Sequence, residues 1–170
     1  MINKKIYYLW GLFSPEETEY LNFIKEKVQI KLISPSFDLH ITLAGPYLNI
    51  DKTFINKLKT FGKSNSSIIL HANGYYFKKE MFKSFYISIQ NSIYLKELRK
   101  TIYKLNKFDL DDNYSPHISL CYGNHQMQEK KELISKLPKL NKTIRITKIA
   151  LVEINDDINQ WKIQESFDLS

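Results

Sequence analysis

Two short segments of this chain repeat the same order of side chains, and this repetition constrains the fold more than any other feature. His40 is followed by isoleucine, Thr42 and leucine, and His117 is followed by isoleucine, Ser119 and leucine. Side chains alternate between the two faces of a β-strand, so each segment would place its histidine and hydroxyl on one face and its two aliphatic groups on the other. The chain is therefore expected to build two similar strands whose polar faces carry the same pair of groups.

The spacing of the two copies indicates a domain made of two related halves. A single histidine on a strand is more often structural or exposed than functional. With four histidines in the chain, two matches to this pattern are expected by chance in about one chain in a few hundred. The copies lie 77 residues apart, at positions 40 and 117 of 170, which is close to half of the chain. The repetition therefore favours equivalent groups placed around one centre.

Two imidazoles and two hydroxyls around one centre suit phosphoryl chemistry. One neutral imidazole can remove a proton from water or from a ribose hydroxyl, while the other, protonated, gives a proton to the departing oxygen. Histidine titrates near pH ~6.5, so both forms are accessible near neutrality. The hydroxyls of Thr42 and Ser119 can donate hydrogen bonds to the non-bridging phosphate oxygens. The residues alone do not decide which of His40 and His117 is the base.

Hydrophobic periodicity and turn residues predict the elements around these strands. Helices are predicted over residues 15–30, 51–61, 92–106 and 126–137, the first with Ser14 as its N-cap. Strands are predicted over residues 6–13, 38–44, 67–77, 83–90, 116–122, 143–154 and 161–169. Gly45-Pro46 is expected to end the second strand, and a turn is expected at residues 111–113. This order indicates an α+β domain with helices outside mostly antiparallel sheets.

Composition limits the class of protein without identifying it. The 170 residues are 43% hydrophobic with only 5 Gly and 5 Pro, which predicts one domain over residues 1–170. The net charge of +7 would attract anionic substrates, although lysine enrichment serves solubility equally well. Cys121 is the single cysteine, so no internal disulfide and no cysteine-rich zinc framework is possible. We expect no metal, no cofactor and no membrane segment, and a monomer located in the cytoplasm.

The paired motifs resemble those of the 2H phosphoesterase superfamily, also called LigT-like or RNA-ligase-like proteins. Within that superfamily the likeness is greatest to the cyclic phosphodiesterases of plants and yeast, and it spans nearly the whole chain. The segments that carry it are Tyr8–Trp10, His40–Leu43, Tyr75–Phe77, Tyr114–Gly123, Ile149–Leu151 and Trp161. The proline, histidine, serine, leucine, tyrosine and glycine within the Tyr114–Gly123 segment are its most specific part.

The resemblance implies a bilobal fold with two mostly antiparallel sheets, outer helices and pseudo-two-fold symmetry around a central cleft. It implies that His40 and His117 are the acid–base pair and that Thr42, Ser119 and Tyr122 bind phosphate. Simple alternation points Tyr122 away from His117, so its role requires the strand to end or twist near Cys121. The implied activity is opening of a nucleoside 2′,3′-cyclic phosphate, an RNA 2′,3′-cyclic end or ADP-ribose 1″,2″-cyclic phosphate.

Other aromatic and histidine residues are secondary candidates. Tyr76, Phe77 and Phe85 belong to a dense aromatic hairpin and are candidates for stacking on a base, although such rings more often pack in a core. His71 is expected to be structural and His125 to be a surface loop residue, because neither has a hydroxyl residue two positions on.

Two other functions are compatible with the same motifs. A 2H enzyme of this size could instead cut cyclic oligonucleotide signals, as phage proteins do when they disarm host immunity. A non-catalytic module that binds RNA ends is the third possibility, although pure binding does not require both imidazoles. The natural substrate and the position of the phosphate on the product stay open.

Overall fold

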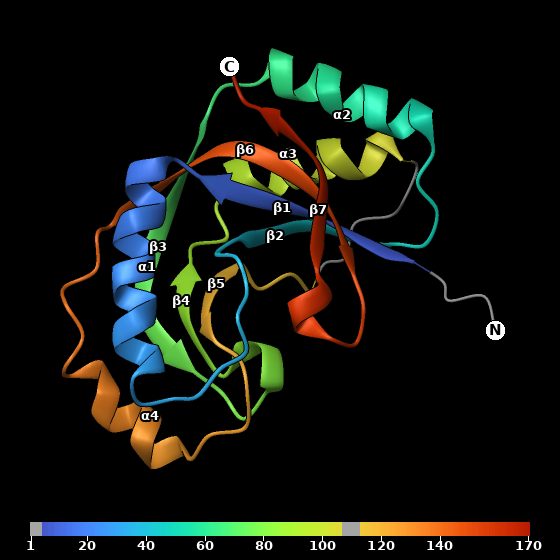
Figure 1. Ribbon diagram of the computed structural model, residues 1–170. Helices are drawn as coiled ribbons and strands as arrows, with labels where there is room; N and C mark the ends of the chain where they lie inside the picture. Colours follow the sequence, from blue (N-terminus) through green and yellow to red (C-terminus); the bar gives the residue numbers. More distant parts are fainter. Residues whose placement is uncertain (1–4, 107–112) are drawn as a thin grey trace.

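The computed structural model describes residues 5–106 and 113–170, which form an α+β domain (Figure 1). The strands are β1 (Ile6–Phe13), β2 (Ile41–Tyr47), β3 (Ile68–Phe77), β4 (Phe85–Ile89), β5 (His117–Cys121), β6 (Thr143–Ile154) and β7 (Lys162–Asp168). The α-helices are α1 (Pro15–Gln29), α2 (Lys52–Ser64), α3 (Ile93–Leu105) and α4 (Met127–Ile134), and the short 3-10 helices are η1 (Met81–Lys83) and η2 (Ile158–Gln160). None of the helices in these two ranges is long and apolar enough to cross a membrane.

The expected elements are present, with one clear correction at β2. Three helices begin at a residue whose side chain accepts a backbone N–H three positions on, namely Ser14, Asp51 and Ser92. Strand β2 does not end at Gly45-Pro46 but continues to Tyr47, which pairs with Tyr7 of β1. A register shift next to Tyr7 accommodates this proline, which has no N–H for the ladder. Residues 111 and 112 of the expected turn lie outside the described residues.

The strands pair antiparallel in the order β1-β2-β5-β4-β3-β6-β7, and β1 also pairs with β6. The two expected sheets are therefore continuous with each other. One lobe holds β1, β2, β6 and β7, and the other holds β3, β4 and β5. The lobes meet at two junctions, where β2 pairs with β5 at one residue on each strand and β3 pairs with β6 over Ile68–His71. The narrow β2–β5 junction is the place where the two histidine motifs come together.

The two halves of the chain are arranged around this junction in the same way. In each half a strand and a helix precede the motif strand, as β1-α1-β2 and as β4-α3-β5. Each helix packs against the motif strand of the other half. Gln29 of α1 donates to the Leu120 carbonyl of β5 (3.1 Å), and Arg99 of α3 donates to the Leu43 carbonyl of β2 (2.8 Å). Leu43 and Leu120 are equivalent positions of the repeated motif, so these contacts are related by the pseudo-two-fold axis.

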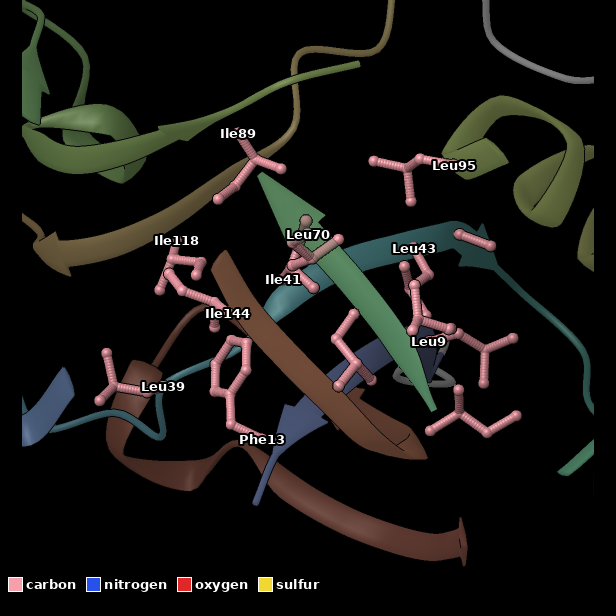
Figure 2. Close-up of a cluster of buried hydrophobic side chains, with 14 of the residues drawn as sticks. Leu9, Phe13, Leu39, Ile41, Leu43, Leu70, Ile89, Leu95, Ile118 and Ile144 are labelled. Atoms are coloured by element: carbon pink, nitrogen blue, oxygen red, sulfur yellow. The ribbon is translucent and has the colours of Figure 1, made fainter. Parts of the chain in front are cut away.

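A hydrophobic core fills the space behind the motif strands. Ile41 and Leu43 of β2 and Ile118 and Leu120 of β5 are fully buried. Figure 2 shows Ile41, Leu43 and Ile118 in one cluster with Leu9 of β1 and further aliphatic side chains. Burial of these aliphatic groups fixes the register of both strands, because a slip by one residue would turn every side chain to the other face. The histidine and hydroxyl groups are therefore held on the opposite face.

Candidate active site

The pairing of β2 with β5 places four polar groups of the motifs on one face. Ile41 lies opposite Ile118, so in an antiparallel pair His40 lies opposite Ser119 and Thr42 lies opposite His117. A rotation of 180° about the centre of the Ile41–Ile118 pair would place His40 on His117 and Thr42 on Ser119. The site therefore has a local two-fold axis. His40 and His117 are diagonal neighbours, a relation that corresponds to a separation of about 7–8 Å. Two imidazoles at this spacing can each hydrogen-bond a different oxygen of one phosphate.

Both histidines are oriented by the same backbone contact. His40 Nδ1 lies 2.7 Å from the Asp38 carbonyl oxygen, and His117 Nδ1 lies 2.8 Å from the Ser115 carbonyl oxygen. A carbonyl oxygen only accepts hydrogen bonds, so Nδ1 carries the proton in each ring. The Nε2 atom of each neutral ring therefore keeps a lone pair, and Nε2 is the atom that exchanges protons with a substrate.

The two imidazoles differ in how strongly the protein opposes their protonation. Burial lowers the pKa of His40 to about 3; the hydrogen bond to Asp38 acts in the opposite direction, and the positive charges of His117 and Lys25 lower the pKa further. Burial also lowers the pKa of His117, again opposed by its backbone hydrogen bond, with Lys83 as the main additional cation. His40 is buried and His117 half-buried. His40 is therefore the better candidate for the neutral base.

Aromatic rings from the neighbouring strands pack against both histidines. Trp10 of β1 is paired with Thr42, and its ring stacks flat on His40 at 3.6 Å between centroids and an interplanar angle of 4°. Tyr86 of β4 is paired with Ser119 and meets His117 edge to face at 5.4 Å. Trp10 and Tyr86 thus occupy equivalent places in the two halves and restrict rotation of the imidazoles.

The hydroxyl groups expected to bind phosphate are in different states. The Thr42 hydroxyl makes no hydrogen bond with any described residue and is free to donate to a phosphate oxygen. The Ser119 hydroxyl donates to the Phe82 carbonyl of η1 at 3.0 Å and must rotate to reach a ligand. Strand β5 ends at Cys121, and Tyr122 lines the same pocket. Burial raises the pKa of Tyr122, opposed by a hydrogen bond with the Ser119 side chain, so its hydroxyl stays protonated as a donor.

These groups line a pocket of about 250 Å³. Its lining residues are Tyr8, Trp10, His40, Thr42, Phe82, His117, Ser119, Tyr122, Ile154 and Trp161. Trp10, Phe82 and Trp161 were not singled out as binding residues from the sequence, although strand alternation places Tyr8 and Trp10 on one face. Gly123, with φ of 125°, donates its N–H to the Met81 carbonyl and so anchors η1 beside the pocket.

The structure does not bring the expected stacking residues to this pocket. Phe85 is fully buried in the core, which corrects its expected role because it has no free ring face. Tyr76 and Phe77 lie on β3, where they pair with Tyr86 and Phe85 across the hairpin.

His71 and His125 exchange their expected roles. His71 is exposed on β3. His125 instead joins three segments, since Nε2 lies 2.7 Å from the Ile33 carbonyl oxygen and Nδ1 lies 3.1 Å from the Ser84 hydroxyl. Within residues 5–106 and 113–170, no group of three His, Cys, Asp or Glu side chains is placed to hold a metal ion.

A tyrosine from the second half holds the motif strand of the first half. The Tyr114 hydroxyl donates to the Thr42 carbonyl at 2.7 Å, and Tyr114 lies three residues before His117. The Arg99 guanidinium covers the Tyr114 ring at 3.4 Å from its centroid. Strands β2 and β5 pair only at Ile41 and Ile118. The Tyr114 hydrogen bond is therefore a second link between the two motifs, and it helps to fix the position of the His40 strand relative to the His117 strand.

The Tyr114→Phe variant is expected to lower kcat about tenfold while KM stays nearly constant, because a small displacement of reacting groups affects the transition state most. Steady-state kinetics on a 2′,3′-cyclic nucleotide, the substrate class that the paired motifs imply, measures both constants. The matched control is Tyr103→Phe, which removes a comparable hydroxyl that donates to the Gly45 carbonyl at 3.3 Å. Equal losses of kcat in the two variants, in proportion to lost stability, would show that Tyr114 is only structural.

Comparisons with known proteins agree with this geometry. The sequence model of the 2′-5′ RNA ligase superfamily matches residues 34–158. No curated protein matches the chain. The apo structure of E. coli LigT is similar with a TM-score of 0.65 and 14% identity, covering 98% of each chain. A crystal structure of a phosphoesterase is similar with a TM-score of 0.63 and 12% identity, covering 99% of each chain. The structure of TT0787 of Thermus thermophilus has a TM-score of 0.61 and 13% identity, covering 96% of this chain and 97% of TT0787.

The fold and the paired histidine strands together define a phosphoesterase of the two-histidine class. At such low identities the similarity to solved structures shows the fold alone, whereas the family match covers most of the sequence. The chain belongs to the 2′-5′ RNA ligase superfamily.

Proposed function

We propose that this protein hydrolyses 2′,3′-cyclic phosphates, as free nucleotides or at RNA ends, or the related cyclic phosphate of ADP-ribose. His40 and His117 supply acid–base catalysis without a metal ion. The observation that supports the proposal is the pair of two-fold-related imidazoles, each with Nδ1 bound to a carbonyl and Nε2 left for proton transfer. In an in-line displacement the entering and departing oxygens lie on opposite sides of phosphorus, so a symmetric pair of proton-transfer groups matches this reaction.

The reaction proceeds by attack of water on phosphorus. His40 Nε2 takes a proton from the water as its oxygen bonds to phosphorus. The bond from phosphorus to one ribose oxygen breaks, and protonated His117 gives its Nε2 proton to that oxygen. The Thr42, Ser119 and Tyr122 hydroxyls donate to the non-bridging oxygens, whose negative charge increases in the transition state. The products are a free ribose hydroxyl and a phosphate monoester, and proton exchange with solvent restores both histidines.

The size of the pocket favours this substrate over a cyclic oligonucleotide, and its charge favours a phosphodiester over a phosphate monoester. A volume of about 250 Å³ is slightly below the usual range for ligand pockets, about 300–1,000 Å³, and suits one phosphate with its sugar. No lysine or arginine of residues 5–106 and 113–170 lines it, so a singly charged diester is easier to hold than a doubly charged monoester. E. coli LigT has been crystallised with 3′-AMP, ATP, phosphate and NADP⁺, all of which carry phosphate groups.

The test is a panel of substrates with product analysis. Adenosine, guanosine, cytidine and uridine 2′,3′-cyclic phosphates are incubated with the protein beside cyclic di- and trinucleotides, with and without EDTA. Turnover of the cyclic mononucleotides, unaffected by EDTA, is the expected result, and ³¹P NMR identifies the 2′- or 3′-phosphate. Turnover confined to cyclic oligonucleotides would move the protein to the signal-degrading class. Tight binding without turnover would support an RNA-end binding module instead.

A further inference from the structure

A second and smaller hollow adjoins the active-site pocket. It has a volume of about 170 Å³ and shares the side chains of Trp10 and Trp161 with the pocket. The two rings meet edge to face at 5.8 Å between centroids, and together they separate the two spaces. Phe37 adds a further aromatic wall to the second hollow. A ligand long enough to pass the edge of Trp161 would therefore occupy both spaces at once.

The polar side chains of the second hollow are mainly hydrogen-bond acceptors. They are Ser36, Asp38 and Asn159. The Asp38 carboxylate makes no hydrogen bond or ion pair with a described residue. Asn159 donates its amide N–H to the Asp157 carboxylate at 3.0 Å, which leaves its own amide oxygen as an acceptor. The hollow thus presents two oxygen acceptors that the rest of the described chain does not use.

Charge excludes a phosphate from this second hollow. Among the described residues no lysine or arginine lines it, and the Asp38 carboxylate would repel an anion. Burial lowers the pKa of Lys25, opposed by the nearby Asp38 carboxylate, and the Lys25 ammonium group donates to the Phe37 carbonyl. The matching ligand is therefore a neutral, flat group with N–H donors. A nucleobase has this chemistry, since single-stranded RNA bases are bound by aromatic rings and by hydrogen bonds along their edges.

We propose that the second hollow binds the base of the nucleoside adjoining the one that carries the cyclic phosphate, with Asp38 accepting its N–H groups. This inference rests on the proposed function and narrows the substrate to the end of an RNA chain. Guanine fits best, because its ring N–H and its amino group can both donate to one carboxylate. Uracil, which has a single ring N–H, is the weaker ligand.

The test compares a dinucleotide with its terminal unit alone. The wild-type kcat/KM for guanylyl-adenosine 2′,3′-cyclic phosphate is expected to exceed that for adenosine 2′,3′-cyclic phosphate about 10-fold to 100-fold, the effect of a hydrogen bond to a charged group. Asp38→Asn is expected to reduce this ratio to a few-fold. Asp156→Asn, which changes an exposed carboxylate outside both hollows, is the matched control and keeps the wild-type ratio.

The outcomes separate this inference from the proposed function. Equal kcat/KM for the two substrates, or a wild-type ratio in Asp38→Asn, would overturn the subsite while leaving cyclic-phosphate hydrolysis intact. If neither substrate is hydrolysed, the proposed function fails. A binding measurement then tests whether the subsite exists. Guanylyl-adenosine is expected to quench the fluorescence of Trp10 and Trp161, with a Kd about tenfold weaker in Asp38→Asn. An unchanged Kd in that variant would overturn the subsite without any reference to turnover.

Discussion

Replacing either His40 or His117 by glutamine is expected to lower kcat for a 2′,3′-cyclic nucleotide by about 10²–10⁴-fold, the usual contribution of a positioned acid or base. Glutamine preserves much of the volume of the ring but cannot transfer a proton near neutral pH. KM is expected to change little, because the Thr42, Ser119 and Tyr122 hydroxyls, which we propose hold the phosphate, are unchanged. Steady-state kinetics with adenosine 2′,3′-cyclic phosphate measures both constants.

The double variant distinguishes a coupled pair from two separate contributions. Residues that act in one step have non-additive effects, so the variant that lacks both histidines is expected to be little worse than the poorer single variant. His71→Gln is the matched control, since His71 is exposed on β3, away from the pocket, and its activity should equal that of the wild type. If either single variant turns over every cyclic nucleotide at close to the wild-type rate, the two histidines are not the catalytic pair.

The motif strands could be predicted from the sequence because their signal is local. Alternation of polar and aliphatic residues around His40 and His117 is sufficient to place each imidazole and its neighbouring hydroxyl on one face. The end of β5 at Cys121 then brings Tyr122 into the pocket, as its expected role required. The α+β class and most element boundaries follow from equally local patterns of helix capping and periodicity.

Long-range contacts account for most of what the sequence could not supply. Phe82 and Trp161 reach the pocket from η1 and from the segment before β7, and neither belongs to a periodic pattern that points there. Phe85 and Tyr86 are adjacent aromatic residues, yet the pairing of β4 with β5 turns Tyr86 toward His117 and leaves Phe85 in the core. Only the register of the assembled sheet decides between two such neighbours.

The rate is expected to depend on pH with an optimum on the acidic side of neutrality. In the proposed mechanism the free enzyme is active when His40 is neutral and His117 is protonated. Since the pKa of His40 is lowered to about 3 and that of His117 lies below its ordinary value of 6.5, kcat/KM should rise to a plateau above about pH 3. As the pH rises above the pKa of His117, which lies below 6.5, kcat/KM should fall again by about tenfold per pH unit.

A bound phosphate shifts the basic side of this profile in a known direction. The anion stabilises the His117 imidazolium and raises its pKa, so kcat, which reports the enzyme–substrate complex, should keep its plateau to a higher pH than kcat/KM does. Rates measured from pH 2 to pH 9 give both curves, including the acidic limb near pH 3. His117→Gln is expected to abolish the basic limb and His40→Gln the acidic limb in the residual activity. If the basic limb is lost in the His40 variant instead, His40 is the acid and His117 the base, because each limb belongs to the residue whose removal abolishes it.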